Sequence, residues 1–200
     1  MREDGLVGKP RRRYRQTTDS RHANRIWPDR VRQNFTVQQP NRVWVSDITY
    51  IPTRSKWLYL CVVLDLYSRK VIGWSMQTSL SSELAIQAVR MAWRHRAPKT
   101  KPIFHSDRGI QYASSQFQHQ LQRLGLQPSM SPKGVCYDNA VAEAFMRNLK
   151  VEAVYGNNFE TTDQAKAAIF EYIEVYYNRI RRHSTLKYLS PEEFEKNTVA

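Results

Sequence analysis

Three β-rich runs within residues 43–78 constrain the fold of this chain more than any other feature. The first, VWVSDITYI, alternates between two faces, with Trp44 and Ile48 on one side and Asp47 on the other. The second, WLYLCVVLDLYS, is almost continuously apolar, which is typical of a central strand buried on both faces. The third, VIGWSMQT, follows a short turn. Together they predict an antiparallel meander.

After residue 80 the hydrophobic period lengthens, and helices alternate with short strands. Leu84, Ala88 and Met91 recur at helical spacing behind Ser81 or Ser82, either of which can serve as the N-cap. The order βββαβαβαα predicts an α/β fold with a mixed five-stranded sheet flanked by helices. The further elements that we expect are a helix over 81–96, a strand at PIFHSD, a helix over 114–124, a strand at LQPSM, and helices over 139–155 and 162–179.

Positive charge is unevenly distributed along the chain. The net charge is +13 and the pI is about 10.0, which indicates a polyanionic partner or, alternatively, a solubilising surface. Residues 1–42 carry eleven Lys and Arg against four Asp and Glu. We therefore expect residues 1–40 to form a basic N-terminal arm or linker, with a short helix near 19–25, and residues 41–195 to form the core domain with a basic C-terminal helix.

Cysteine usage and hydropathy exclude several other classes of protein. Cys61 and Cys136 lie in unrelated contexts without a CxxC motif, so neither a disulfide framework nor a zinc site is indicated. No run approaches the 18 or more apolar residues of a membrane span. We expect a cytoplasmic protein without a membrane partner.

Three carboxylates stand out as candidates for chemistry. Asp47 lies in the first strand, Asp107 ends the run FHSD, and Glu143 lies in a helical stretch after a further 35 residues. Oxygen ligands of this kind suit hard cations such as Mg²⁺. A pair of metal ions can stabilise both the attacking and the leaving oxygen of an in-line phosphoryl displacement. Asp65 is a rival carboxylate, although its place before Tyr67 and Ser68 is typical of a turn.

Five segments resemble a known family: VWVSDITYI, WLYLCVVLDLYSRKVIGW, HSDRGIQY, SPKGVCYDNAVAEAFMRNLKVE and YNRIRRHSTLKYLSPEEF. They are similar to bacterial insertion-sequence transposases of the retroviral-integrase type, above all the second-frame product of the insertion-sequence-three family. The resemblance extends from about residue 5 to residue 194. It implies an RNase H-like fold and an acidic triad known as DDE, which maps onto Asp47, Asp107 and Glu143 as catalytic and metal-binding residues.

The resemblance also implies an activity. A DNA transposase of this type hydrolyses a phosphodiester at the transposon end and then transfers the freed 3′-hydroxyl into DNA, so the chain is expected to serve DNA integration and recombination. It implies two Mg²⁺ ions during catalysis, for which Mn²⁺ can substitute. By analogy, Asp47 would bridge both ions while Asp107 and Glu143 would each bind one. The expected partner is double-stranded DNA, both transposon ends and target, with the protein nucleoid-associated when bound.

Several basic and polar residues are candidates for DNA contact. Asn139, Arg147 and Lys150 share a helix side with Glu143, although a solvated helix face is the alternative. Basic residues near a helix C-terminus can instead complement the helix dipole. The full set of predicted DNA-binding residues is Arg11, Arg12, Arg13, Asn139, Arg147, Lys150, Arg181, Arg182 and His183.

The N-terminal arm resembles only the tail of the helix-turn-helix region that family members carry. We therefore expect end recognition to depend on a separate helix-turn-helix product, and the chain to act as a homo-oligomer, dimeric or larger, on DNA. Two hypotheses compete with an active transposase. One is a catalytically silent, truncated remnant that modulates transposition by binding DNA, and the other is a stand-alone RNase H-like nuclease.

Overall fold

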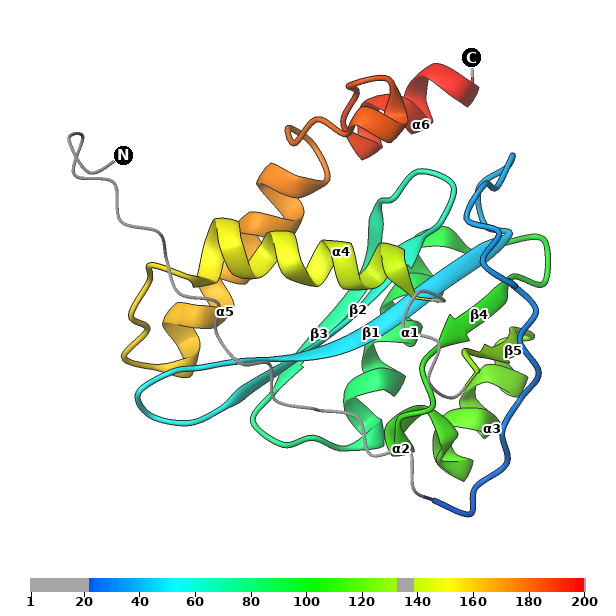
Figure 1. Ribbon diagram of the computed structural model, residues 1–200, viewed down its shortest axis with the longest axis horizontal. Helices are drawn as coiled ribbons and strands as arrows, with labels where there is room; N and C mark the ends of the chain where they lie inside the picture. Colours follow the sequence, from blue (N-terminus) through cyan, green and yellow to red (C-terminus); the bar gives the residue numbers. More distant parts are fainter. Residues whose placement is uncertain (1–21, 133–138, 200) are drawn as a thin grey trace.

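A five-stranded mixed sheet forms the centre of the protein, as the computed structural model of residues 22–132 and 139–199 shows (Figure 1). The strand order is β3-β2-β1-β4-β5. The α/β, RNase H-like sheet expected from the sequence is therefore confirmed. The strands are β1 (Val43–Ile51), β2 (Leu58–Asp65), β3 (Val71–Gln77), β4 (Ile103–Ser106) and β5 (Gln127–Met130).

Strands β1, β2 and β3 form the predicted antiparallel meander. Asp47 lies opposite Val62, and Val62 lies opposite Trp74 on the next strand. Strand β2 is buried almost throughout, as its continuous apolar run predicts. Strands β4 and β5 add in parallel to the other side of β1, so the sheet is mixed.

Helices cover both faces of the sheet and divide the core in two. On one face, Trp44 and Cys61 pack with α1 (Ser82–Arg96), α2 (Ile110–Ala113) and α3 (Ser115–Arg123). On the other face, Val45 and Val62 pack with the helices of the C-terminal third. Because side chains alternate along a strand, Asp47 shares the second face with Val45.

The C-terminal third forms a chain of helices. α4 (Ala140–Leu149) continues as the π-helical segment η1 (Lys150–Val154), and α5 (Thr162–Phe170) continues as η2 (Glu171–Tyr177). The 3₁₀ turn η3 (Ser184–Leu186) and helix α6 (Pro191–Val199) follow. None of the helices within the described ranges is long and apolar enough to cross a membrane.

The helix ends follow the expected capping chemistry only in part: Ser81 stands at the predicted N-cap of α1, but its side chain makes no capping hydrogen bond. Ser114 accepts a hydrogen bond from the N–H of Phe117 and begins α3, but the short helix α2 before it was not expected. Helix α6 was not expected either. Its start is marked by Ser190 and Glu193, whose side chains and backbones bond reciprocally as a capping box.

The described part of the N-terminal arm runs in irregular backbone along the sheet. The helix expected near 19–25 is wrong for residues 22–25, which are not helical, and its remainder lies outside the described residues. The His22 Nε2 atom is 2.9 Å from the carbonyl oxygen of Arg108, and the Arg30 N–H donates to Ser129 at 2.9 Å. These long-range bonds tie the arm to β5 and to the loop after β4.

Protein groups occupy part of the open edge of β3. The Asn178 side chain bonds both backbone groups of Val71, at 2.9 Å each. The His95 ring lies 3.1 Å from the carbonyl oxygen of Ile72, and the Trp74 N–H donates to Met91 sulfur at 3.4 Å. An edge strand otherwise presents unpaired backbone groups to any neighbouring strand.

Gly73 allows β3 and α1 to approach closely, which generates a stability prediction. A Cβ atom there would lie 2.4 Å from the Ala88 carbonyl oxygen and 2.6 Å from the Ala92 nitrogen. Because both contacts are backbone, Gly73→Ala must displace the helix. We expect a loss of about 2–3 kcal/mol, seen as a melting temperature lower by about 5–10 °C.

The control for this prediction is Gly125→Asn. Gly125 has φ +69° and open space around its Cα, and Asn tolerates that conformation. Its melting temperature should fall by less than half as much. Equal losses in the two variants would contradict the close helix–strand approach as the cause.

Candidate active site

The pairing of β1 with β4 brings two of the candidate carboxylates together. The strands pair in parallel from Val43 with Ile103 to Val45 with His105. Continuing this register by two residues sets Asp47 opposite Asp107, just beyond the end of β4. In parallel sheets this carboxyl end of the strands is where sites form.

Backbone hydrogen bonds orient both aspartates. The Oδ1 atom of Asp47 accepts the Ile48 N–H at 2.8 Å, and Oδ1 of Asp107 accepts the Gly109 N–H at 2.8 Å in a turn. Both side chains are partly exposed. Each carboxylate is therefore fixed in direction while still reachable from solvent.

Helix α4 supplies the third carboxylate and is anchored to β1 beside the first. Asn139, at the N-cap of α4, is buried and donates from Nδ2 to the Ser46 carbonyl at 2.9 Å. One turn further on, the Glu143 N–H donates to the Asn139 carbonyl at 3.0 Å, and the Glu143 side chain is exposed. The bond from Asn139 to Ser46 thus fixes the start of the helix next to Asp47.

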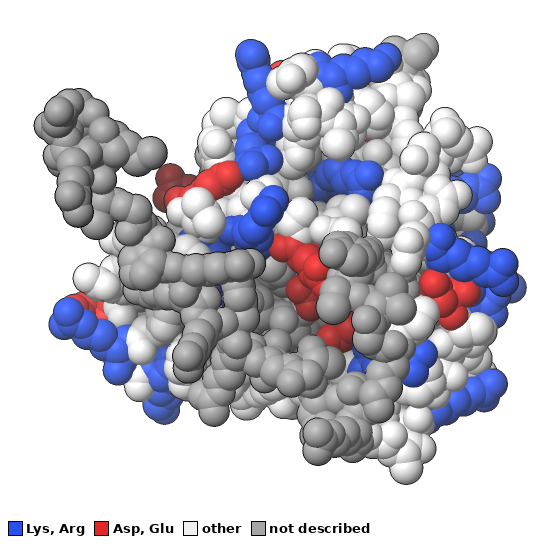
Figure 2. All heavy atoms as spheres, viewed as in Figure 1, with Lys and Arg blue, Asp and Glu red and all other residues white. Residues whose placement is uncertain are grey.

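The three carboxylates influence one another electrostatically. Burial, followed by the charges of Asp107 and Glu143, raises the pKa of Asp47 to about 8, against the opposing effects of the Ile48 N–H and Lys150. Burial and then Asp107 also raise the pKa of Glu143. Acidic side chains gather near the middle of the face viewed in Figure 1, with Lys and Arg around them (Figure 2). Clustered negative charge of this kind favours a cation.

The residue types suit a divalent ion, although they are not assembled around one. All three donors are carboxylate oxygens, the ligands that Mg²⁺ and Mn²⁺ prefer. Within residues 22–132 and 139–199, no group of three or more His, Cys, Asp or Glu side chains converges closely enough to hold a metal. A cation bound here would oppose the burial and the neighbouring charges that raise the pKa of Asp47.

A buried hydroxyl pair supports β1 on its other face. Ser46 Oγ donates to the Val62 carbonyl at 2.8 Å and lies 2.8 Å from the Tyr112 hydroxyl, itself 3.6 Å from the Cys61 sulfur. This contact joins α2, which follows Asp107, to the strand that carries Asp47. The sequence analysis missed it, although a serine on the apolar face of a strand indicates a buried partner.

The candidate DNA-binding residues on α4 have different surroundings. Arg147 is exposed, whereas Lys150 is partly buried with its Nζ atom 4.8 Å from the centroid of the Tyr50 ring. Burial lowers the pKa of Lys150, and the charge of Asp47 opposes that shift. Asn139 is engaged within the protein, as described above. Their DNA contacts stay predictions, and Arg11, Arg12 and Arg13 lie outside the described residues.

The candidate DNA-binding residues 181–183 also differ in their surroundings. Arg181 forms a two-pronged ion pair with Glu152, with N–O distances of 2.9–3.1 Å, whereas Arg182 is exposed. His183 packs edge-to-face on Tyr177 at 5.0 Å, and its Nε2 atom is buried without a hydrogen-bond partner. Burial, followed by the charges of Arg181 and Arg69, lowers the pKa of His183 to about 4. His183 is therefore neutral at pH 7.

The rival carboxylate Asp65 has a structural role. It is fully buried, accepts N–H bonds from Asn41 and Tyr67, and pairs with Arg96 at 3.2 Å. Arg96 in turn pairs with Glu195. This network docks α6 against the turn after β2.

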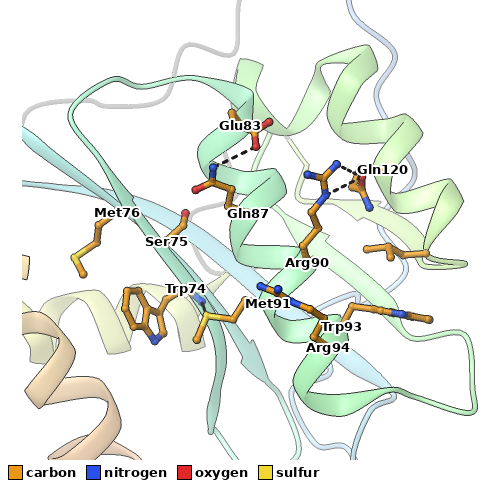
Figure 3. A pocket seen from close by; sticks show the side chains of 11 residues that line it. Trp74, Ser75, Met76, Glu83, Gln87, Arg90, Met91, Trp93, Arg94 and Gln120 are labelled. Carbon is orange, nitrogen blue, oxygen red and sulfur yellow. Dashed lines mark hydrogen bonds between the residues drawn. The ribbon is translucent and has the colours of Figure 1, made fainter.

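The cavity shown in Figure 3 lies apart from the three carboxylates. It has a volume of about 690 Å³ and lies between β3, α1 and α3. Along its wall, Arg90 donates two hydrogen bonds to Gln120, and Gln87 donates one to Glu83 (Figure 3). Glu83 is the one carboxylate among its lining residues, so it lacks the donor set of a metal site.

Comparisons with known proteins agree on one family. Two family models described as integrase core domains match residues 37–136 and 143–199. The chain is 45% identical over 201 residues to the transposase InsF for insertion sequence IS3A of Escherichia coli (strain K12), covering all of this chain and 69% of that protein. It is 42% identical over 192 residues to the transposase for insertion sequence element IS904 of Lactococcus lactis, covering 96% of this chain and 76% of the relative.

Solved structures show the same fold at low sequence identity. The catalytic core domain of BIV integrase matches with a TM-score of 0.58 at 17% identity, covering 80% of this chain and 96% of that one. The Mos1 transposase catalytic domain matches with a TM-score of 0.53 at 16% identity, covering 68% and 72% respectively. At these identities the likeness concerns the fold alone.

The partly buried imidazole of His183 generates a prediction about acid stability. Its pKa is about 4 in the folded protein, below the ordinary value of 6.5. Between these values the unfolded chain binds a proton that the folded chain does not. The stability that His183 contributes is therefore complete above pH 6.5 and is lost as the pH falls to about 4.

Urea unfolding of the variant His183→Gln and the wild type from pH 4 to pH 8 tests this direction of the pH dependence of stability. The difference in unfolding free energy between wild type and variant should be greatest above pH 6.5 and shrink as the solution is acidified. A constant difference across this range would show that His183 does not titrate in this way.

Proposed function

The chain belongs to the insertion-sequence transposases that have an integrase core, and from this premise we propose that it cuts DNA at transposon ends and joins the freed 3′ ends to target DNA. The reaction is phosphodiester hydrolysis followed by attack of the 3′-hydroxyl on a second phosphodiester. Both steps are phosphoryl transfers, so one site can serve both.

The observation that best supports this proposal is the place of Asp47 and Asp107 on neighbouring strand ends, with Glu143 on a helix that is anchored beside them. The strand register sets Asp47 opposite Asp107, and α4 is tied to Ser46 by Asn139. Each carboxylate comes from a separate element anchored in the core, as positioned ligands require. Their mutual effects on pKa support a common site.

We propose that the three carboxylates bind Mg²⁺, with Mn²⁺ as a substitute and two ions present during catalysis. The catalytic core of HTLV-2 integrase was solved with magnesium and the Mos1 catalytic domain with manganese or magnesium. When bound, the ions would supply Lewis acidity and stabilise charge on the attacking and leaving oxygens.

The protein's own groups orient the reactants. Asp47 and Asp107, each fixed through Oδ1 by a backbone N–H, present a rigid pair of ligands, and Glu143 approaches from the exposed side of α4. Lys150 lies close enough to Asp47 to interact with its charge, where an ammonium can also balance a DNA phosphate. No protein nucleophile is required, because water and then the 3′-hydroxyl attack.

We propose that Arg147, Lys150 and Arg182 contact DNA phosphates, together with the basic segment that contains Arg11, Arg12 and Arg13. The strongly basic composition supports this assignment. Asn139 and Arg181 have partners within the protein, Ser46 and Glu152, so we assign them to positioning rather than to phosphate contact.

Transposon ends and target DNA are the proposed partners, bound by a dimer or larger homo-oligomer. The HTLV-2 integrase core was crystallised in dimeric and trimeric forms. We further propose that a separate helix-turn-helix product assists end recognition, and that residues 1–40 act as an arm to the core of residues 41–195. Gel filtration of the protein with and without DNA would test the oligomer.

Strand transfer gives the first functional prediction. Purified full chain with a labelled duplex carrying a cognate element end and Mg²⁺ should give metal-dependent joined product. Asp107→Asn and Glu143→Gln should each reduce it by more than 100-fold, since even outer-shell partners of a metal site cost 10- to 100-fold.

The matched control is Glu83→Gln. Glu83 lies in the first turn of α1 and is exposed, as Glu143 is in the first turn of α4. It should retain wild-type activity. DNA binding without any cleavage by the wild type would favour the silent remnant, and cleavage of hybrid substrates without joining would favour a nuclease.

Adjacent arginines give a second functional prediction. Removing one phosphate contact makes the fall of log K for DNA binding with log salt concentration less steep, by about 0.9 in slope. Arg182→Gln should show this decrease, because Arg182 is exposed. Arg181→Gln should leave the slope unchanged and lower the melting temperature, because its charge is committed to Glu152. The reverse pattern would show that Arg181 turns from Glu152 to DNA.

A further inference from the structure

Trp57 is the most exposed of the five tryptophans. It lies just before β2 in the connection from β1, and 46% of its surface is exposed. The other tryptophans, Trp27, Trp44, Trp74 and Trp93, are buried or partly buried. The exposed part of this large indole gains no burial energy, so that surface is available to a partner.

A contact with Tyr50 connects Trp57 to the candidate active site. The two rings are 5.1 Å apart and almost perpendicular, at 81°. Lys150 Nζ lies 4.8 Å from the Tyr50 ring centroid, and Lys150 interacts with the charge of Asp47. Trp57 is therefore linked through Tyr50 to Lys150, which senses the charge of Asp47. We call Trp57 and Tyr50 the aromatic ledge.

A small cleft brings Tyr50 and one of the carboxylates to the same wall. Its lining residues include Asp107, Gly109, Tyr50, Tyr59 and Leu80. It opens where β1 continues beyond its pairing with β4, which ends at Val45 and His105 on the two strands. An apolar, aromatic wall thus adjoins one of the carboxylates directly.

We propose that the aromatic ledge stacks an unpaired nucleobase of the DNA close to the reacting phosphate. The ligand class is a nucleobase whose face is exposed, at a frayed end or a short overhang, since paired and stacked bases offer no free face. Every base has a π-face, so this recognition tolerates sequence. Lys150 balances the neighbouring phosphate. The inference rests on the proposed function, because it requires DNA at the three carboxylates.

The test compares two fluorescein-labelled duplexes of identical sequence, one blunt and one with three unpaired nucleotides at a 5′ end. The full chain should bind the overhang at least about fivefold more tightly. Trp57→Ala should abolish this preference, and Trp57→Phe should keep most of it. Both variants should melt close to wild type, since the side chain is exposed.

Phe170→Ala is the matched control. Phe170 is 50% exposed and also has one nearly perpendicular aromatic neighbour, Trp74, at 6.0 Å and 76°. It lies on the far edge of the sheet, beside β3, and its loss should leave the overhang preference intact.

Each outcome decides the inference separately from the proposed function. An overhang preference that survives in Trp57→Ala overturns the ledge. If the same variant also changes its oligomeric state in sedimentation, Trp57 belongs to a protein interface instead. A preference that depends on Trp57, in a protein that never joins ends, supports the ledge and overturns the proposed activity. A wild type that binds neither duplex overturns both.

Discussion

The site depends on the shortness of the parallel pairing between β1 and β4. Only Val43–Val45 pair with Ile103–His105, after which the two strands separate while β1 continues with β2 to Ile51. The separation opens the sheet at its centre, beside Asp47 and Asp107. A longer ladder would close this gap with backbone hydrogen bonds, and a shorter one would leave the two carboxylates without a common register. Helix α4 then needs one anchor, Asn139 on Ser46, to bring Glu143 alongside.

The elements that the sequence predicts well are those whose signal is local. The β-meander over 43–78 and the helix over 81–96 follow from hydrophobic period and capping, which depend on neighbours within a few residues. The places of Asp107 just after β4 and of Glu143 in the first turn of α4 also follow from local signals, whereas their roles stay predictions. The resemblance of these segments to known transposases added the roles that spacing alone could not give.

The features that escaped prediction depend on partners far along the chain. Arg181 reads as one of several exposed basic residues, yet Glu152, 29 residues earlier, holds it. Asn139 reads as polar and outward-facing, yet it is buried on Ser46, 93 residues away. Helix α6 was missed for a different reason. Its capping box was visible in the sequence, but a short, highly charged segment carries little apolar period.

The side chains bonded to the backbone of the β3 edge restrict how copies of this protein can assemble. Asn178 bonds both backbone groups of Val71, while His95 contacts the carbonyl of Ile72 and Met91 accepts the N–H of Trp74. A neighbouring chain cannot extend the sheet past these residues without first displacing side chains that are already bonded. If copies gather on DNA as we propose, addition of strands at this edge, the contact by which sheets grow into continuous fibrils, is disfavoured even at high local concentration.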